Sequence, residues 1–268
     1  MKKLLLTIAI MLVAVSVGLL TAGCSNSISP SPSWADEENL TYAIQDTTTH
    51  ENKGVMTVKT VRSPVNKTLN GKEYASADGK VTIDVEMTGE YTVHTEFLTS
   101  KYTVLALQKT YTDLTDASKN YVLNAKHGDG YYYYDKNGQT GEIKVGSSYT
   151  DSEYLYHYIR SYPLTSPPSG FSIADPNDGS AKKIVCFAVT VSDNTVTVPY
   201  PSSNKVVACK VIRISLSDKP HGASILAYFT PDETAYYMSG LSMFSSKKIP
   251  VKIIENDLTY VVTAMSVK

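Results

Sequence analysis

Residues 81–87 read Val81-Thr82-Ile83-Asp84-Val85-Glu86-Met87. Apolar and polar side chains alternate along this run, which is the pattern of a β-strand with one buried face and one solvated face. The turn signal Gly89-Glu90 follows, and Tyr91–Phe97 then resumes as a second strand. Two such strands joined by a short turn predict an antiparallel hairpin.

Strand patterns continue on both sides of this hairpin. Short turn signals such as Asn70-Gly71 and Lys136-Asn137-Gly138 separate many of them, so strands that follow one another in the chain should pair as neighbours. We interpret Ser192-Asp193-Asn194 as the turn of one further hairpin. The pattern therefore predicts a mainly β protein with one antiparallel sheet of about ten strands. The other predicted strands are Leu40–Ile44, Val55–Val61, Tyr102–Thr112, Tyr121–Ala125, Tyr131–Tyr134, Lys183–Val191, Thr195–Pro199, Val206–Leu216, Ser224–Phe229, Ile249–Glu255 and Leu258–Val267.

One segment departs from the strand pattern. Thr150-Asp151-Ser152-Glu153 has the spacing of a capping box, in which Thr150 caps a helix and Glu153 reaches back to it. Apolar residues then recur at helical spacing until Pro163 stops the run. We predict one helix of about three to four turns from about Asp151 to Tyr162, packed in the concave face of a large curved sheet.

The N-terminus has the pattern of an export signal. Lys2 and Lys3 precede an uncharged apolar run, Leu4–Leu20, which leads into Thr21-Ala22-Gly23-Cys24. Small residues directly before a cysteine match the bacterial lipobox, although leucine is commoner at the position of Thr21. We predict that residues 1–23 are a lipoprotein signal peptide and that Cys24 is lipidated. A plain signal peptide and an uncleaved anchor helix are the alternatives.

Residues 24–36 are interpreted as the lipidated N-terminus and a flexible tether, because serine and proline dominate Ser25–Ser33. Residues 37–268 are predicted to be a single half-barrel domain. The lipid would anchor this domain to the outer face of the cell membrane, or to the outer membrane in a cell with two membranes. Ser25, the residue after the lipidated cysteine, favours the outer membrane in that second case.

The amino-acid composition excludes one class of function and points to another. The 268 residues carry a formal net charge of −1, so the chain lacks the basic footprint of a nucleic-acid-binding protein. Twenty tyrosines accompany only five phenylalanines, and nine of the twenty fall between Tyr131 and Tyr162. A tyrosine has an apolar ring and a polar tip, so this cluster either closes a core or lines a cavity with a wet mouth. The candidate ligand-binding residues are Tyr132, Tyr134, Tyr154, Leu155, Tyr158 and Ile159.

Three further residues leave alternatives open. Cys186 and Cys209 lie in apolar strands of an exported chain, so a disulfide between them and two buried free thiols are both compatible with the sequence. Arg160 lies near the polar boundary of the predicted helix. It could form a surface salt bridge or meet the acidic head group of a ligand.

Patterns of catalysis are missing from the sequence. No His-Glu-x-x-His zinc motif, no Gly-x-Ser-x-Gly nucleophile elbow and no phosphate-binding loop is found. The five histidines are interpreted as surface or strand residues, and the acidic residues near Asp129 as turn residues. We therefore predict a non-enzymatic protein without a metal or cofactor. The histidines are His50, His94, His127, His157 and His221.

Several motifs follow one another in a characteristic order. They are Tyr131–Asp135, the helix with Asp151, Leu155, Tyr158, Arg160 and Pro163-Leu164, then Val206–Val211, Tyr228–Asp232 and Ile249–Ile253. This order resembles that of a family of bacterial envelope lipoproteins, which are similar to the lipoprotein-carrier superfamily that includes LolA, LolB, LppX and LprG. The resemblance covers roughly Leu40 to Val267, and it implies an unclosed half-barrel with a helical lid whose concavity holds acyl chains in the carriers. Residues Thr234–Lys248 interrupt the family's pattern and could reshape the mouth of such a cavity.

Two functions are compatible with these observations. The first is a membrane-anchored, non-enzymatic lipoprotein that binds a lipid or other hydrophobic ligand in the half-barrel. The second is a structural or interaction module of the envelope with a filled core and an unidentified protein partner. An apolar cavity of several hundred Å³ between helix and sheet would favour the first function, and a fully packed interface would favour the second.

Overall fold

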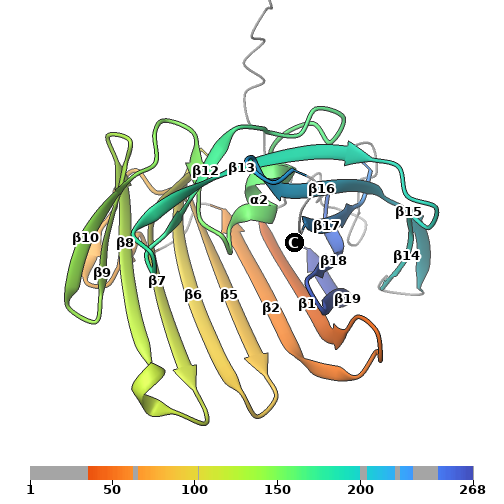
Figure 1. Ribbon diagram of the computed structural model, residues 1–268, viewed down its shortest axis with the longest axis horizontal. Coiled ribbons are helices and arrows are strands. Elements are labelled where there is room, and N and C mark those ends of the chain that lie inside the picture. The colour runs from red at the N-terminus through yellow and green to blue at the C-terminus, as the bar shows by residue number, and fades with distance from the viewer. Residues whose placement is uncertain are drawn as a thin grey trace, which may run out of the picture.

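The computed structural model describes residues 36–62, 66–101, 103–199, 204–220, 224–231 and 247–267. Within these residues the chain is mainly β, and one large sheet of fifteen strands dominates it (Figure 1). The segments predicted to be a signal peptide and a Ser/Pro tether, the predicted lipidation site Cys24 and most of the segment 234–248 lie outside the described residues.

Most strands of the large sheet are long and lie at the predicted positions. Two small sheets of two strands each accompany it, one formed by β3 (Thr68–Leu69) with β4 (Lys72–Glu73) and one by β14 (Thr195–Val198) with β15 (Lys205–Ala208). The strands of the large sheet are β1 (Glu37–Asp46), β2 (Asn52–Arg62), β5 (Gly79–Met87), β6 (Tyr91–Ser100), β7 (Thr103–Asp113), β8 (Tyr121–Gly128), β9 (Tyr131–Lys136), β10 (Gln139–Lys144), β11 (Tyr149–Thr150), β12 (Phe171–Asp175), β13 (Ser180–Val189), β16 (Lys210–Leu216), β17 (Ser224–Phe229), β18 (Pro250–Glu255) and β19 (Leu258–Val267).

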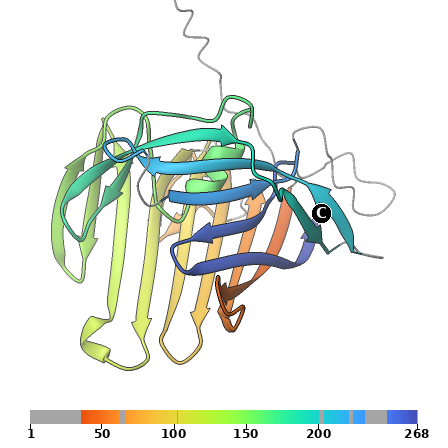
Figure 2. The same cartoon turned by 45° about the vertical axis from the view of Figure 1, so that its right-hand side comes forward.

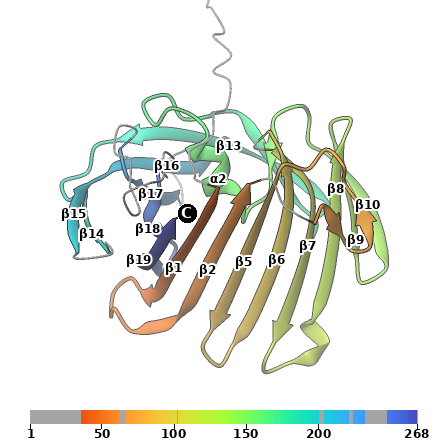
Figure 3. The same cartoon turned by 180° about the vertical axis from the view of Figure 1, so that it is seen from behind.

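The order of these strands explains the open shape. It runs β10-β9-β8-β7-β6-β5-β2-β1-β19-β18-β17-β16-β13-β12-β11, so the first and last strands pair with each other in the middle of the sheet. Every pair is antiparallel except the short parallel pair β11–β12. The edges β10 and β11 do not pair, and the sheet curves without closing into a barrel (Figures 1 and 3). The predicted mainly β half-barrel is therefore confirmed.

The two halves of the curved sheet face each other. Figure 2 shows the C-terminal strands, in blue, lying across the N-terminal strands, in orange and yellow. Alternation decides which side chains point inward: one row crosses from Tyr42 through Met56, Val85 and Val93 to Tyr111. The core forms on this inner side, as the alternation predicts.

The strand count and one hairpin differ from the sequence prediction. The sequence prediction missed β10, β11 and β12, and it joined β15 and β16 into the single strand Val206–Leu216, although the strand is interrupted at Cys209. β11 has only two residues, and β10 has no alternation of apolar and polar side chains to reveal it. The segment Ser192–Asn194 does not form a hairpin between β13 and β14, because β13 pairs with β16. Asn194 and Cys209 instead bond to each other, with Cys209 N donating to Asn194 O at 2.8 Å and Asn194 Nδ2 donating to Cys209 O at 3.2 Å. This link directs β14 and β15 into their own small sheet.

The helix is shorter than predicted and has no capping box. Helix α2 covers only Leu155–Arg160, its N-cap is Tyr154 without a side-chain cap bond, and Thr150 belongs to β11. Glu153 bonds to Lys109 on β7 rather than reaching back to Thr150. A helix of this length has little stability by itself, and its contacts with the sheet must therefore hold it in place. It lies on the concave side, as predicted (Figures 1 and 3).

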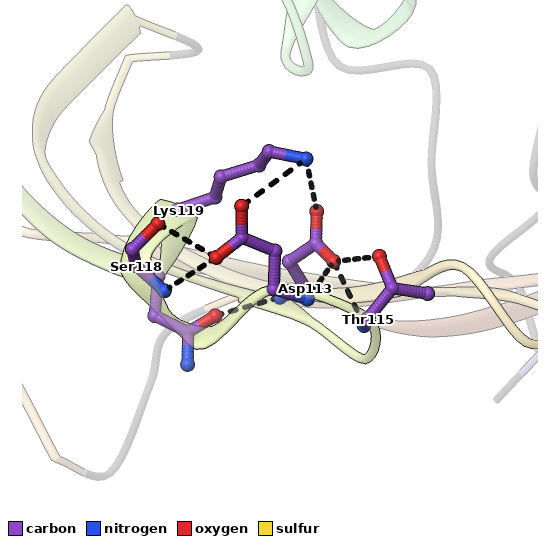
Figure 4. Close-up of polar contacts among 6 residues, drawn as sticks. Asp113, Thr115, Ser118 and Lys119 are labelled. Atoms are coloured by element: carbon purple, nitrogen blue, oxygen red, sulfur yellow. Dashed lines mark hydrogen bonds and ion pairs between the residues drawn. The ribbon is translucent and has the colours of Figure 1, made fainter.

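The connection between β7 and β8 is built by side-chain caps at the open end of the sheet. Asp113 accepts hydrogen bonds from Thr115 N at 2.9 Å, Thr115 Oγ1 at 2.7 Å and Asp116 N at 2.8 Å (Figure 4). Asp116 caps the 3-10 turn η1 (Ala117–Lys119) by accepting from Ser118 N at 3.0 Å. The bonds from Thr115 and Asp116 lower the pKa of Asp113 to about 2.

Candidate functional site

A cavity of about 450 Å³ lies between α2 and the concave face of the sheet. This volume lies within the range of about 300–1,000 Å³ typical of small-molecule sites. Both halves of the sheet contribute to its walls, and most of the lining side chains are apolar. The aliphatic lining residues are Met56, Val58, Ile83, Val85, Leu155, Ile173, Ile184, Ile214, Leu216, Ile225 and Ile253.

Helix α2 crosses a single row of inward-facing residues on the sheet. The ring of Tyr154 packs at 5.5 Å from Phe97 on β6. One turn later His157 Nε2 lies 2.9 Å from Thr60 Oγ1 on β2, and Arg160 follows with its contact to β1. Residues three apart are neighbours on the surface of a helix, so each step of this spacing brings the next contact to another strand: β6, then β2, then β1.

Arg160 fixes the C-terminal end of the helix. Its Nη1 and Nη2 donate to Glu38 Oε1 and Oε2 at 2.6 and 3.1 Å, and Nη2 also donates to Lys247 O at 2.7 Å. Both charged side chains are fully buried. The expectation of an exposed arginine at a polar boundary is therefore wrong, because a carboxylate on β1 draws the guanidinium into the core. Such two-pronged pairs are geometrically specific.

His157 lines the cavity from the middle of the helix and is buried. Burial and the positive charge of Arg160 lower its pKa to about 3. The imidazole is therefore neutral near pH 7, and it bonds to Thr60. Its position differs from the expected surface or strand histidine.

Glu153 stands at the entry to the helix and lines the cavity. Burial opposes its charge, but the Lys109 ammonium and hydrogen bonds from Lys109 and Ser152 lower the pKa of its carboxyl. Ser152 Oγ donates to Glu153 Oε2 at 2.8 Å. The negative charge of Glu153 is thus compensated by its ion pair with Lys109.

Glu255 is the second acid of the cavity and has different surroundings. It follows Ile253 on the inward face of β18, beside the turn that begins at Asn256. Among the described residues, no hydrogen bond or ion pair is made by its carboxylate. Burial and the negative charge of Glu153 raise its pKa. An acid with a raised pKa in a cavity is a typical mark of a functional site.

Tyr156 and Tyr260 line the cavity together with Glu255. Burial and the charge of Glu255 raise the pKa of Tyr156, and the same two causes raise the pKa of Tyr260 to about 12. Both phenols therefore remain neutral. The cavity has apolar walls and an acidic, tyrosine-rich region, which together fit an amphiphilic molecule.

The predicted ligand-binding residues divide between the cavity and its surroundings. Leu155 lines the cavity. Tyr154 and Ile159 are fully buried, and Tyr158 packs at 4.9 Å from Phe171 and shares a hydrogen bond of 3.1 Å with Ser148 Oγ. These three hold the helix in the core.

Tyr132 and Tyr134 lie on β9, away from the walls of this cavity. The ring of Tyr132 stands edge-on to His127 at 4.8 Å, and His127 Nε2 lies 3.0 Å from Asp151 Oδ2 in a buried pair. Tyr134 packs over Gly141 on β10, where a Cβ atom would come within 2.5 Å of the phenol oxygen. The tyrosine cluster of the sequence thus serves the core as well as the cavity.

Sequence reasoning missed Tyr156, His157, Glu255 and Tyr260. Alternation alone could have located Glu255 and Tyr260, because each belongs to a strand whose inward face includes a residue two positions away, Ile253 or Val262. The two helix residues gave no such signal, because they lie between the apolar positions of the predicted stripe.

The two cysteines are buried free thiols and do not form a disulfide. Cys186 lies on β13 and Cys209 directly precedes the neighbouring strand β16, but Cys186 pairs with Ile214, five residues beyond Cys209. Five residues of a strand span about 16 Å, whereas a disulfide needs Cα atoms within about 7 Å. Burial raises the pKa of each thiol to about 12.

No group of three or more His, Cys, Asp or Glu side chains in the described part of the chain is placed to hold a metal ion. No helix there is both long and apolar enough to cross a membrane.

No model of a known protein family matches the sequence, and no curated protein matches it significantly. Among solved structures, the chain is similar to the crystal structure of a β-barrel-like protein of the domain of unknown function DUF1849 from Brucella abortus. The identity is 10%, the TM-score is 0.44, and the match covers 88% of this chain and 99% of that chain. Any inference about a ligand therefore rests on the residues that line the cavity of this chain.

Proposed function

We propose that this protein is a membrane-anchored, non-enzymatic lipoprotein of the bacterial envelope that holds a lipid or other hydrophobic ligand beneath α2. The observation that carries this proposal is the cavity of about 450 Å³ with mainly aliphatic walls. A purely structural module would gain stability by filling that volume, since empty apolar space forfeits packing. The cavity therefore favours ligand binding over the alternative of a filled interaction module.

The position of the cavity also supports binding. Its walls come from both halves of an unclosed sheet and from a helix held between them, an arrangement that gives a ligand a largely pre-formed site. The anchors of that helix, Arg160 and His157, are buried and bonded. Rigid surroundings reduce the ordering cost of binding.

Membrane attachment is proposed from the lipobox at Leu20–Cys24. Each buried methylene contributes about 0.8 kcal/mol, so two or more acyl chains on Cys24 give a stable anchor. Cells fed a fatty-acid analogue should label the wild-type protein and not Cys24→Ser. Equal labelling of both proteins would refute the anchor.

An apolar fluorescent probe, 1-N-phenylnaphthylamine, tests the binding site itself. Met56 and Val55 are neighbours on β2, but Met56 lines the cavity while Val55 is 40% exposed on the opposite face. The probe should bind wild-type protein and Val55→Trp alike, and Met56→Trp should bind it more weakly because the larger indole occupies part of the cavity. Equal binding by both variants, with both folded by circular dichroism, would place the probe elsewhere and contradict the proposal.

A further inference from the structure

We infer that the ligand of this cavity carries a cationic nitrogen at its polar end, and that Glu255, Tyr156 and Tyr260 receive this ammonium group. The inference rests on the proposed binding function and names the chemical class of its ligand. The apolar part of the molecule would lie among the aliphatic side chains beneath α2.

The charges along the cavity wall are acidic only. Glu153 and Glu255 line it, and none of the described lining residues is a lysine or arginine. The lining histidine, His157, is buried, neutral near pH 7 and bonded to Thr60. A fatty acid or phospholipid head group would therefore bring a negative charge to a wall without a positive partner, which is costly in a partly buried site.

The two acids are not equivalent. Lys109 and Ser152 bond to Glu153, so its charge is already compensated. The carboxylate of Glu255 has no hydrogen-bond or ion-pair partner in the described part of the chain, and it is half-buried. An ammonium group would supply the missing counter-charge at Glu255.

Two tyrosine side chains line the cavity together with the carboxylate of Glu255. Tyr156 comes from α2 and Tyr260 from β19, and both line the same cavity as Glu255. The charge of Glu255 acts on both phenols. The faces of tyrosine rings attract cations, and clusters of aromatic rings are known to bind quaternary and methylated ammonium groups.

The lysines on the far side of Glu153 are engaged with other groups. Lys109 pairs with Glu153, and Lys182 pairs with Asp175. Lys136 lies 4.4 Å from the ring centre of Tyr121. An anionic head group that extended past Glu153 would compete with these contacts for the lysines and would meet the carboxylates of Glu153 and Asp175, so this region favours an anion less than a cation.

Three ligands with the same chain test the inference: decylamine, decanol and decanoate, titrated calorimetrically at neutral pH. The proteins are wild type, Glu255→Gln and the matched control Glu86→Gln, which removes an exposed acid from the opposite face of β5. Wild type and Glu86→Gln should bind decylamine at least about ten-fold more tightly than either other ligand, a difference of about 1.4 kcal/mol. In Glu255→Gln this preference should disappear, while decanol binding stays unchanged.

The other possible outcomes of these titrations each contradict a different part of the inference. Equal affinity for decylamine and decanol, or tighter binding of decanoate, would overturn the cationic head group and leave the binding function intact. A preference for decylamine that survives in Glu255→Gln would overturn the role of Glu255. Failure of all three ligands to bind folded wild-type protein would refute the proposed function as well as the inference.

Discussion

The guanidinium of Arg160 and the carboxylate of Glu38 form a two-pronged ion pair in which neither side chain is exposed to solvent. The pair joins the last residue of α2 to β1, the strand that pairs with the C-terminal strand in the middle of the sheet. It therefore positions the helix that forms one wall of the cavity. Burying two charges costs free energy, so the pair contributes geometry more than net stability.

Breaking this ion pair should destabilise the protein strongly. Arg160→Met leaves a buried carboxylate without its main counter-charge, for which we expect a loss of about 3–5 kcal/mol in the free energy of unfolding. The double variant Arg160→Met with Glu38→Met should lose much less than the two single variants together. Urea denaturation gives the free energy of unfolding of the wild type, the two single variants and the double variant. As a control, Lys53→Met breaks an exposed pair with Glu51 and should cost less than about 1 kcal/mol. Additive losses at Arg160 and Glu38 would contradict the coupling.

His157 should make stability depend on pH. The unfolded chain takes up a proton on this residue below about pH 6.5, whereas the folded imidazole stays neutral down to about pH 3. Stability should therefore be fully present above pH 6.5 and fall by up to about 1 kcal/mol per pH unit as the pH drops to 5. His157→Gln should remove this slope, and His94→Gln, at an exposed position, should keep it. Urea denaturation curves between pH 5 and 7 measure this slope for each protein. An unchanged slope in His157→Gln would show that His157 is not its source.

Glu255→Gln should stabilise the folded protein at neutral pH. The folded-state pKa of this carboxyl is raised, so its ionised form is less stable in the fold than in the unfolded chain. The resulting loss of stability develops as the pH rises through the unfolded and then the folded pKa. The melting temperature of Glu255→Gln at pH 7 should exceed that of wild type, with Glu86→Gln unchanged. A lower melting temperature would show that the carboxylate stabilises the fold.

The two cysteines should behave as buried thiols. In Cys24→Ser protein, denatured without reductant, iodoacetamide should add to both Cys186 and Cys209, because the structure holds them as free thiols. The native protein should react far more slowly, since burial raises the pKa of each thiol to about 12 and only thiolates react. Intact-mass spectrometry reads both results. Absence of any mass gain after denaturation would reveal a disulfide.

Alternation predicted the sheet because the rule is local. On β1, for example, every second residue from Glu38 to Ile44 is buried, and this includes the charged residue at the start. Periodicity does not reveal why a glutamate occupies a buried position. Its partner, Arg160, is 122 residues further along the chain, so only the folded structure brings the two together.

The helix shows the same limit. The apolar stripe of Tyr154, Leu155, Tyr158 and Ile159 correctly indicated a helix, but the residues that cross the sheet are Tyr154, His157 and Arg160. Two of these three are polar, so hydrophobic periodicity assigns them to the solvent. Likewise, the capping-box spacing failed because Glu153 finds a stronger partner in Lys109 on a distant strand.

Lipid extraction of the full-length protein tests ligand binding most directly. The protein and its variants Met56→Trp and Val55→Trp are purified from detergent extracts of whole cells, denatured in organic solvent and analysed by mass spectrometry. If the cavity binds a ligand, wild type and Val55→Trp should release the same small amphiphile in near-equal amount to protein, and Met56→Trp should release clearly less. If all three proteins release the same molecules in the same amounts, or none releases any, the cavity does not hold the ligand.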